Sequence, residues 1–175
     1  MLNVVMTSGI PGCGKSTFAK AWLDVSPKTR ARANRDDIRE MIGSSKQHNG
    51  DTDFEKLVTA IQFKTIWEHL KAGRDVIVDN THLQPKYFMQ LREFVQAFAN
   101  QFNKPVCFSV EVLDVDYDVC LARNNARDRV VPTEVVSRMY DSFVKIKKYI
   151  KENYSSPIII YPQHPQTIMV GAPNA

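Results

Sequence analysis

The sequence contains few cysteines and no long apolar run. Its three cysteines, at positions 13, 107 and 120, form no CxxC pair and have no histidine at zinc-ligand spacing, which argues against a disulfide framework and a zinc site. This cysteine usage fits a reducing, cytoplasmic setting. No stretch reaches the roughly 18 apolar residues of a membrane span, and residues 1–6 lack the basic flank and cleavage site of a signal peptide. We therefore expect no membrane partner.

A large excess of charge of one sign is also absent. Lysine and arginine number 23 against 19 aspartates and glutamates, so the formal net charge of +4 permits a polyanionic partner without demonstrating one. With 175 residues, of which 43% are apolar and 24% charged, the chain has the size and composition of one globular domain. We expect a single domain over residues 1–175, with an extended tail after about residue 161.

Short apolar runs alternate with segments of helical periodicity along the chain. The runs predict buried strands at 2–7 and 75–79 and further strands at 105–113 and 157–161, and residues 29–33 could form a short strand. Apolar residues three and four apart predict helices at 15–26, 34–43, 54–72, 85–98, 117–127 and 132–149, with polar loops at 44–50 and 80–84. Repeated strand–helix units predict an α/β fold with a mainly parallel β-sheet covered by helices on both faces.

A glycine-rich segment between the first predicted strand and the first predicted helix matches GxxxxGK[ST] in full. It reads Gly9-Ile10-Pro11-Gly12-Cys13-Gly14-Lys15-Ser16. Glycines allow the backbone N–H groups to surround a β-phosphate, and the helix start directs its positive end to the same group. We expect Lys15 to reach the β- and γ-phosphates and the Ser16 hydroxyl to bind magnesium. Cys13 is expected to be a small filler. The alternative, a turn without a ligand, is disfavoured by the complete motif and its position.

This P-loop predicts nucleotide binding but leaves the reaction open. The guanine-recognition sequence NKxD is missing, because Asn103-Lys104 is followed by Pro105-Val106. A GTPase is therefore disfavoured, and the function depends on whether an acceptor site can be found.

One candidate acceptor site is the segment NRDDIR, residues 34–39, which begins the second predicted helix at the carboxyl edge of the sheet. Asp36 and Arg39 are three residues apart and share a helix face, so a carboxylate could accept a hydroxyl proton while a guanidinium holds a neighbouring phosphate. Alternatively, Asn34 is the N-cap and the aspartates interact with the helix dipole. The segment alone does not decide between these roles.

A second candidate follows the strand at 75–79. Asp79 ends this strand, as a magnesium-shell acid would in a Walker B arrangement, although it could instead close the strand with an Asx-turn. Thr81 and His82 could bind an acceptor phosphate, but a lone loop histidine is more often solvated. The remaining histidines show no partner spacing and receive no role: His48, His69 and His164.

Positive charge opposite the P-loop is expected on the helix predicted at 117–127. Arg123 and Arg127 are four residues apart and would share one face of it, followed by Asp128-Arg129. An arginine-bearing helical lid would stabilise the charge of a transferring phosphoryl group. A solvated basic helix face is the alternative.

The sequence resembles the 5′-kinase domain of phage polynucleotide kinase, the P-loop half of the kinase–phosphatase enzymes. The segments that carry the resemblance are GIPGCGKST, NRDDIR, VDNTHLQP, and RNNAR followed by VVP and SRMY. The resemblance covers residues 2 to about 149. It implies a P-loop NTPase-type fold and transfer of the ATP γ-phosphate, with Mg²⁺, to the 5′-hydroxyl ends of DNA or RNA during end repair. A phage-encoded enzyme would act in the host cytoplasm.

The resemblance also implies roles for individual residues. The nucleotide-binding set would comprise Gly9, Gly12, Cys13, Gly14, Lys15, Ser16, Thr17, Arg123 and Arg127, with Ser16 and Asp79 at the metal. Asp36 would be the general base and Arg39 a contact to the acceptor's 3′-phosphate. Asn80 and Thr81 would complete the acceptor site, and Val131 would touch the terminal base. Lys15, Asp36, Arg39 and Arg127 would form the catalytic set.

The sequence departs from that family at three points. His82 replaces a small amide, the segment after Arg127 is shortened with Asp128 in place of a glycine, and no DxDGT phosphatase motif occurs. We predict no 3′-phosphatase activity, so a ligase or phosphatase partner would be separately encoded, and an oligomer is possible. Two other functions stay open: a small-molecule or nucleotide kinase of the same superfamily, and a nucleotide-dependent module that binds nucleic-acid ends.

Overall fold

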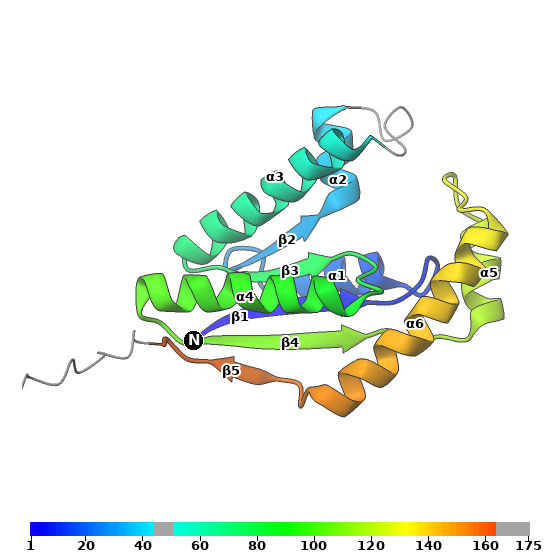
Figure 1. Ribbon diagram of the computed structural model, residues 1–175. Helices are drawn as coiled ribbons and strands as arrows, with labels where there is room; N and C mark the ends of the chain where they lie inside the picture. The colour runs from blue at the N-terminus through cyan, green and yellow to red at the C-terminus, as the bar shows by residue number, and fades with distance from the viewer. Residues whose placement is uncertain (44–50, 164–175) are drawn as a thin grey trace, which may run out of the picture.

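The computed structural model describes residues 1–43 and 51–163 (Figure 1). Its sheet has five strands in the order β2-β3-β1-β4-β5. Their bounds are β1 (Leu2–Ser8), β2 (Arg30–Asn34), β3 (Asp75–Asp79), β4 (Val106–Val112) and β5 (Ile158–Ile160). The first four strands are parallel, and the edge strand β5 pairs antiparallel with β4. The mainly parallel α/β fold is confirmed. The predicted loop at 44–50, His48, His164 and the end of the predicted tail lie outside the described residues.

Helices connect the strands. They are α1 (Lys15–Asp24), α2 (Arg35–Ile42), α3 (Thr52–Lys71), α4 (Pro85–Phe102), α5 (Tyr117–Asn125) and α6 (Thr133–Asn153). All six were predicted, but α5 ends two residues earlier than expected. Arg127 therefore lies in the loop after the helix, and the prediction that it shares a helix face with Arg123 is wrong. None of the helices in the described residues has the length and apolarity to cross a membrane.

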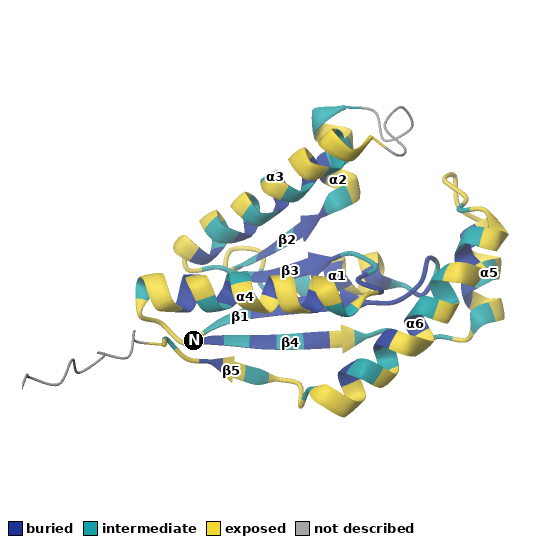
Figure 2. Ribbon diagram, viewed as in Figure 1, coloured by how far each residue is buried: buried dark blue, intermediate teal, exposed yellow. Residues whose placement is uncertain are grey.

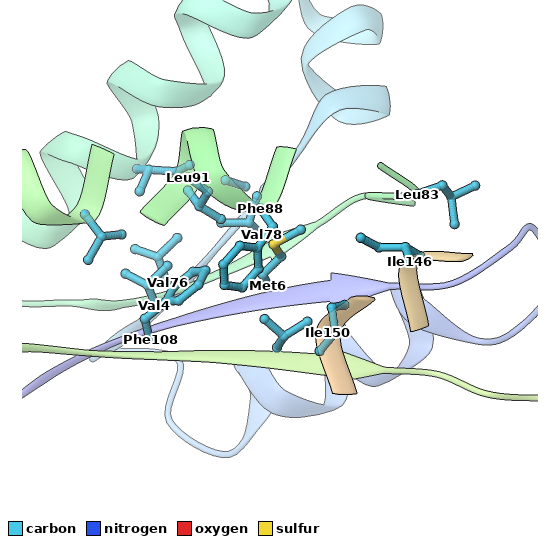
Figure 3. Close-up of a cluster of buried hydrophobic side chains, with 14 of the residues drawn as sticks. Val4, Met6, Val76, Val78, Leu83, Phe88, Leu91, Phe108, Ile146 and Ile150 are labelled. Carbon is cyan, nitrogen blue, oxygen red and sulfur yellow. The ribbon is translucent and has the colours of Figure 1, made fainter. Parts of the chain in front are cut away.

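The core follows from the alternation of side chains along the strands. Val4 and Met6 of β1 point to the face covered by α4 and α6, where Phe88 and Ile146 meet them (Figure 3). Val5 points to the opposite face and packs against α1. Burial of the strands between these layers is seen in Figure 2. Because both faces are covered, the central strands β1 and β3 are mostly apolar and buried, and the sequence predicted them on that basis.

The carboxyl ends of β1, β2 and β3 meet at one edge of the sheet, since all three strands are parallel. The P-loop leaves β1 there, α2 starts directly after β2, and residues 80–84 connect β3 to α4. In Figure 1, α5 and the first turns of α6 stand beside the same edge. Segments far apart in the sequence thus converge where α/β proteins bind ligands.

Candidate active site

A cleft of about 1700 Å³ opens at this edge. It is lined by the P-loop, α2, α3, the end of β3, the start of α4 and the loop after α5. Nine residues that the sequence predicted for the site line it: Lys15, Ser16, Asp36, Arg39, Asp79, Asn80, Thr81, Arg127 and Val131. Six others do not: Gly9, Gly12, Cys13, Gly14, Thr17 and Arg123. The structure therefore brings the predicted donor and acceptor groups to one cleft but places Arg123 outside its lining.

The P-loop backbone takes a shape that side chains would block. Gly12 and Gly14 have φ values of 83° and 96°, in the left-handed region that favours glycine. A Cβ atom on Gly9 would lie 2.6 Å from the Cys13 sulfur, and one on Gly12 would run into the Cys120 carbonyl oxygen of α5. Cys13 is buried, as expected of a filler. The glycines thus form a backbone cradle that fits a phosphate chain.

Lys15 begins α1 and folds back over this cradle. Its ammonium donates to the Ile10 carbonyl oxygen at 2.7 Å and lies 3.5 Å from the Cys13 sulfur. Gly14, the N-cap of α1, has no side chain to occupy the first helical N–H groups. These donors, the positive helix end and the lysine all fit a polyphosphate. The Ser16 hydroxyl lies on the same turn of α1. It is the P-loop group suited to bind a magnesium ion held by that polyphosphate.

On the acceptor side, Asn34 and Asp36 have separate roles. The Asn34 Oδ1 atom accepts from the backbone N–H groups of Asp36 and Asp37 at 2.8 and 3.0 Å, so the predicted N-cap is confirmed. The Asp36 carboxylate accepts instead from the Arg39 guanidinium at 2.6 Å, so the predicted common face is also confirmed. The cap leaves the Asp36 side chain, which is 57% exposed, directed at the cleft.

Glu55 on α3 is a site residue that the sequence analysis missed. It accepts from Arg39 Nε at 2.7 Å and from Arg39 Nη2 at 2.9 Å, and a third bond comes from Arg35 at 2.7 Å. The Arg39 hydrogen bonds, with help from Arg35, lower the pKa of Glu55 to about 2 against the opposing effect of burial. Glu55 therefore fixes the guanidinium beside Asp36. Only the three-dimensional packing of α3 on α2 reveals it, because it follows Arg39 by 16 residues on another helix.

Asp79 is buried at the end of β3 and is held by the neighbouring strand. Arg32 of β2 donates to its carboxylate from Nε at 2.9 Å and from Nη2 at 2.7 Å, and Asn34 donates at 3.2 Å. Its backbone carbonyl oxygen also accepts from Asn34, at 2.6 Å. The carboxylate lines the cleft with its charge balanced by Arg32. Asn80, the next residue, accepts from the Arg35 backbone N–H at 3.1 Å and so ties this loop to the start of α2.

His82 is buried, and the expectation of a solvated loop histidine is wrong. Its Nδ1 donates to the Thr7 carbonyl oxygen at 2.7 Å, which leaves Nε2 unprotonated beside the Asn80 amide nitrogen at 3.4 Å. Burial lowers the pKa of His82 to about 4, although the hydrogen bond to Thr7 raises it; Arg35 and Lys15 lower it further, and Asp79 raises it. A neutral ring therefore connects the end of β1 to Asn80.

The buried histidine predicts a pH dependence of stability. The unfolded chain takes up a proton near pH 6.5, but the folded chain does so only near pH 4, so falling pH favours unfolding across this window. Protonation of His82 should lower the free energy of unfolding by about 3 kcal/mol between these pH values, and we expect His82→Asn to remove this loss. Urea unfolding from pH 4 to 8, without nucleotide or metal, measures it. His69→Asn, on α3, should change the profile much less; equal profiles for His82→Asn and the parent would contradict the expectation.

The loop after α5 is pinned from inside by Asn124. Its Oδ1 accepts from Arg127 Nη2 at 2.7 Å and from the Val131 backbone N–H at 3.2 Å, while its Nδ2 donates to the Val131 carbonyl oxygen at 2.8 Å. Because Asn124 is fully buried, these bonds hold the loop in place although most of it is exposed. Arg129, at its tip, reaches across to the Asp36 carboxylate at 3.4 Å. The lid loop thus touches the acceptor helix.

Comparison with known proteins identifies the family of the chain. The family model described as an AAA domain matches residues 4–146. The chain belongs to this family. A curated relative, the L-seryl-tRNA(Sec) kinase of Methanococcus maripaludis, is 27% identical over 147 residues, which cover 80% of this chain and 52% of that protein. The family and the P-loop place the chain in the P-loop kinase superfamily and support a phosphotransferase, for which ATP is the implied donor, usually with Mg²⁺.

Two solved structures share the fold of this AAA domain. A chain from the structure of the Pnkp1/Rnl/Hen1 RNA repair complex is 21% identical with a TM-score of 0.74, and the match covers 99% of this chain and 52% of that one. A second structure of the Pnkp1/Rnl/Hen1 complex gives 19% identity and a TM-score of 0.64, with 99% and 50% coverage. The chain spans about half the length of the curated relative and of these two structures.

Proposed function

We propose that this AAA domain is an ATP-dependent polynucleotide 5′-hydroxyl kinase that acts on nucleic-acid ends, including RNA ends. The observation that carries the proposal is the Asp36–Arg39–Glu55 cluster, which faces the P-loop lysine across one cleft. A carboxylate beside a fixed guanidinium is suited to an acceptor that offers both a hydroxyl and a phosphate. A nucleic-acid 5′ end offers both.

In this mechanism ATP, bound with Mg²⁺, supplies the γ-phosphoryl group. The P-loop amides and Lys15 bind its phosphates, and Ser16 would hold the ion. Asp36 orients the 5′-hydroxyl and accepts its proton as the 5′ oxygen bonds to the transferred phosphorus and the bond to the ADP oxygen breaks. Arg39 holds the acceptor's 3′-phosphate, and Arg127 neutralises charge on the transferring group.

Contacts around the cluster hold it in place. Asn34 caps α2, Asn80 binds the Arg35 backbone, and Glu55 orients Arg39, so Asp36 sits on a helix start that three separate elements fix. A site held in this way loses little entropy when its substrate binds. Asp79 would take part in the magnesium shell while its carboxylate is also paired with Arg32, whose Nη2 lies 2.7 Å away.

Similarity to proteins of RNA metabolism supports an RNA acceptor. One relative is by name a kinase of L-seryl-tRNA(Sec), and the shared fold occurs in an RNA repair complex that also contains Rnl and Hen1. We propose that the product ends pass to an end-processing activity, such as a ligase or phosphatase. Because one relative is a seryl-tRNA kinase, the seryl hydroxyl of seryl-tRNA is the alternative acceptor to test beside the 5′-hydroxyl.

The test is transfer of label from γ-labelled ATP to a matched acceptor panel. It comprises 5′-hydroxyl RNA and DNA oligonucleotides, the same oligonucleotides with a 5′-phosphate, nucleosides, nucleoside 3′-monophosphates and seryl-tRNA. We expect labelling of 5′-hydroxyl oligonucleotides and of nucleoside 3′-monophosphates, and none of 5′-phosphorylated ends. Labelling of seryl-tRNA or free nucleosides alone would overturn the proposal in favour of a different acceptor. ATP binding with no transfer to any acceptor would indicate an end-binding module.

A further inference from the structure

The cleft has room for more than one small ligand. Pockets for one small ligand typically occupy about 300–1,000 Å³, whereas this cleft measures about 1700 Å³. Part of the wall of the cleft lies between α3 and α4. It is lined there by Thr59 and Phe63 of α3 and by Tyr87 and Gln90 of α4. In Figure 1, α3 lies beside the acceptor helix α2, and α3 and α4 both contribute side chains to the larger buried cluster.

Tyr87 stands out on this wall because it is an aromatic ring at a cleft surface. Its side chain is 37% exposed, although the neighbouring Phe88 is buried in the core. The ring centroid lies 6.4 Å from that of His82, and His82 in turn contacts the amide of Asn80. His82 therefore lies close to both the Tyr87 ring and the Asn80 amide, and Asn80 binds the Arg35 backbone at the start of the acceptor helix.

Lys86 adds a positive charge at the same place. Its ammonium lies 5.0 Å from the centre of the Tyr87 ring, and it also lines the cleft. Within residues 1–43 and 51–163, Lys86 forms no salt bridge, whereas Lys15, Arg35 and Arg39 all have oxygen partners. A surface cation–π contact is weak and is readily exchanged for a phosphate.

We propose that Tyr87 and Lys86 form a subsite for the second nucleotide of a single-stranded acceptor, an inference that rests on the proposed function. The base of this nucleotide stacks on the Tyr87 ring, and its 3′-phosphate binds the Lys86 ammonium, while the phosphate between the first and second nucleotides remains with Arg39. Stacking tolerates any base, because every base has a π-face, and a nearby lysine follows the backbone. The subsite would make longer single strands better acceptors than a nucleoside 3′-monophosphate, which ends before it.

The experiment compares kcat/KM for a nucleoside 3′-monophosphate, a dinucleotide and a hexanucleotide, all with a free 5′-hydroxyl. We expect the parent enzyme to prefer the longer acceptors. Tyr87→Leu should lower kcat/KM for the dinucleotide and hexanucleotide about tenfold, mainly through KM, and leave the 3′-monophosphate within about twofold. Tyr87→Phe and Tyr87→Trp, which keep a flat ring, should retain the length preference.

Matched controls separate stacking from folding and from overall charge. Phe18→Leu alters an α1 ring that is also 37% exposed but does not line the cleft, and it should leave all three acceptors unchanged. Lys86→Ala should make the decline of kcat/KM with salt shallower by about 0.7 in the log–log slope for the hexanucleotide. Lys104→Ala, beyond the other end of α4, should not.

Two results would overturn the subsite while leaving the proposed function intact. One is an equal loss on all three acceptors in Tyr87→Leu, which would mean that the ring only supports the loop containing Asn80. The other is no loss on any acceptor. If the parent enzyme transfers phosphate to no oligonucleotide at all, the proposed function fails and the subsite fails with it.

Discussion

Replacing Asp36 by asparagine is expected to abolish most phosphoryl transfer while ATP still binds. Loss of a general base typically costs about 10²- to 10⁴-fold in rate, and we expect kcat to fall within that range. Asparagine keeps the size of the side chain and can still contact Arg39, whose guanidinium lies 2.6 Å from the native carboxylate. The ATP dissociation constant should stay within about twofold, because Lys15 and the P-loop amides lie on a different element. Single-turnover transfer and calorimetric ATP titration provide the two readouts.

Asp37 offers a matched control on the same helical turn. Its carboxylate is 62% exposed, pairs with Arg32 and does not line the cleft. Asp37→Asn removes the same charge and should lower kcat no more than a few fold. If both variants lost activity equally, the effect would be one of net charge at the helix start. If Asp36→Asn transferred phosphate at the parent rate, Asp36 would not be the base.

The second large effect is expected at Gly12. An alanine Cβ there would overlap the Cys120 carbonyl oxygen of α5 and would also demand a left-handed backbone, with φ at 83°. Strain and overpacking together should cost about 2–5 kcal/mol of folding free energy, equivalent to about 4–20 °C in Tm. Relief of the clash must push the P-loop away from α5, so ATP affinity should fall as well. Thermal unfolding and ATP titration measure both effects.

Gly73 separates backbone strain from collision. Its φ of 75° is similar, but no atom lies within 4 Å of an added Cβ, and it follows α3 far from the cleft. Gly73→Ala should cost only the strain, about 1–2 kcal/mol, with normal ATP binding. Equal destabilisation by both substitutions would show that the contact between the P-loop and α5 carries no energy. Normal ATP affinity in Gly12→Ala would show that this contact does not shape the phosphate cradle.

Features that depend on local sequence could be predicted from it. The central strands β1 and β3 are mostly apolar runs, the P-loop is a contiguous motif, and Asn34 caps α2 by a hydrogen bond to a residue two positions away. The common face of Asp36 and Arg39 follows from helix periodicity alone. Such features require no knowledge of how the elements pack.

The features that were missed depend on contacts between elements distant in the sequence. Glu55 acts on Arg39 across α3 and α2, and Asp79 is held by Arg32 across two strands. Burial of His82 arises because its ring bonds the end of β1, 75 residues away in the chain. The early end of α5 reflects the Asn124 amide, which binds Val131 and turns the chain back. No spacing in the sequence signals these contacts.

The most direct test of the central claim is to locate the transferred phosphate. A 5′-hydroxyl RNA is labelled with γ-labelled ATP and Mg²⁺ and then digested to nucleoside 5′-monophosphates by a nuclease that leaves 5′-phosphates. The account predicts that all label appears in the 5′-monophosphate of the terminal nucleotide and that prior 5′-phosphorylation prevents labelling. Label at a 3′ position, or no label in RNA and DNA while ATP binds, would contradict a polynucleotide 5′-kinase.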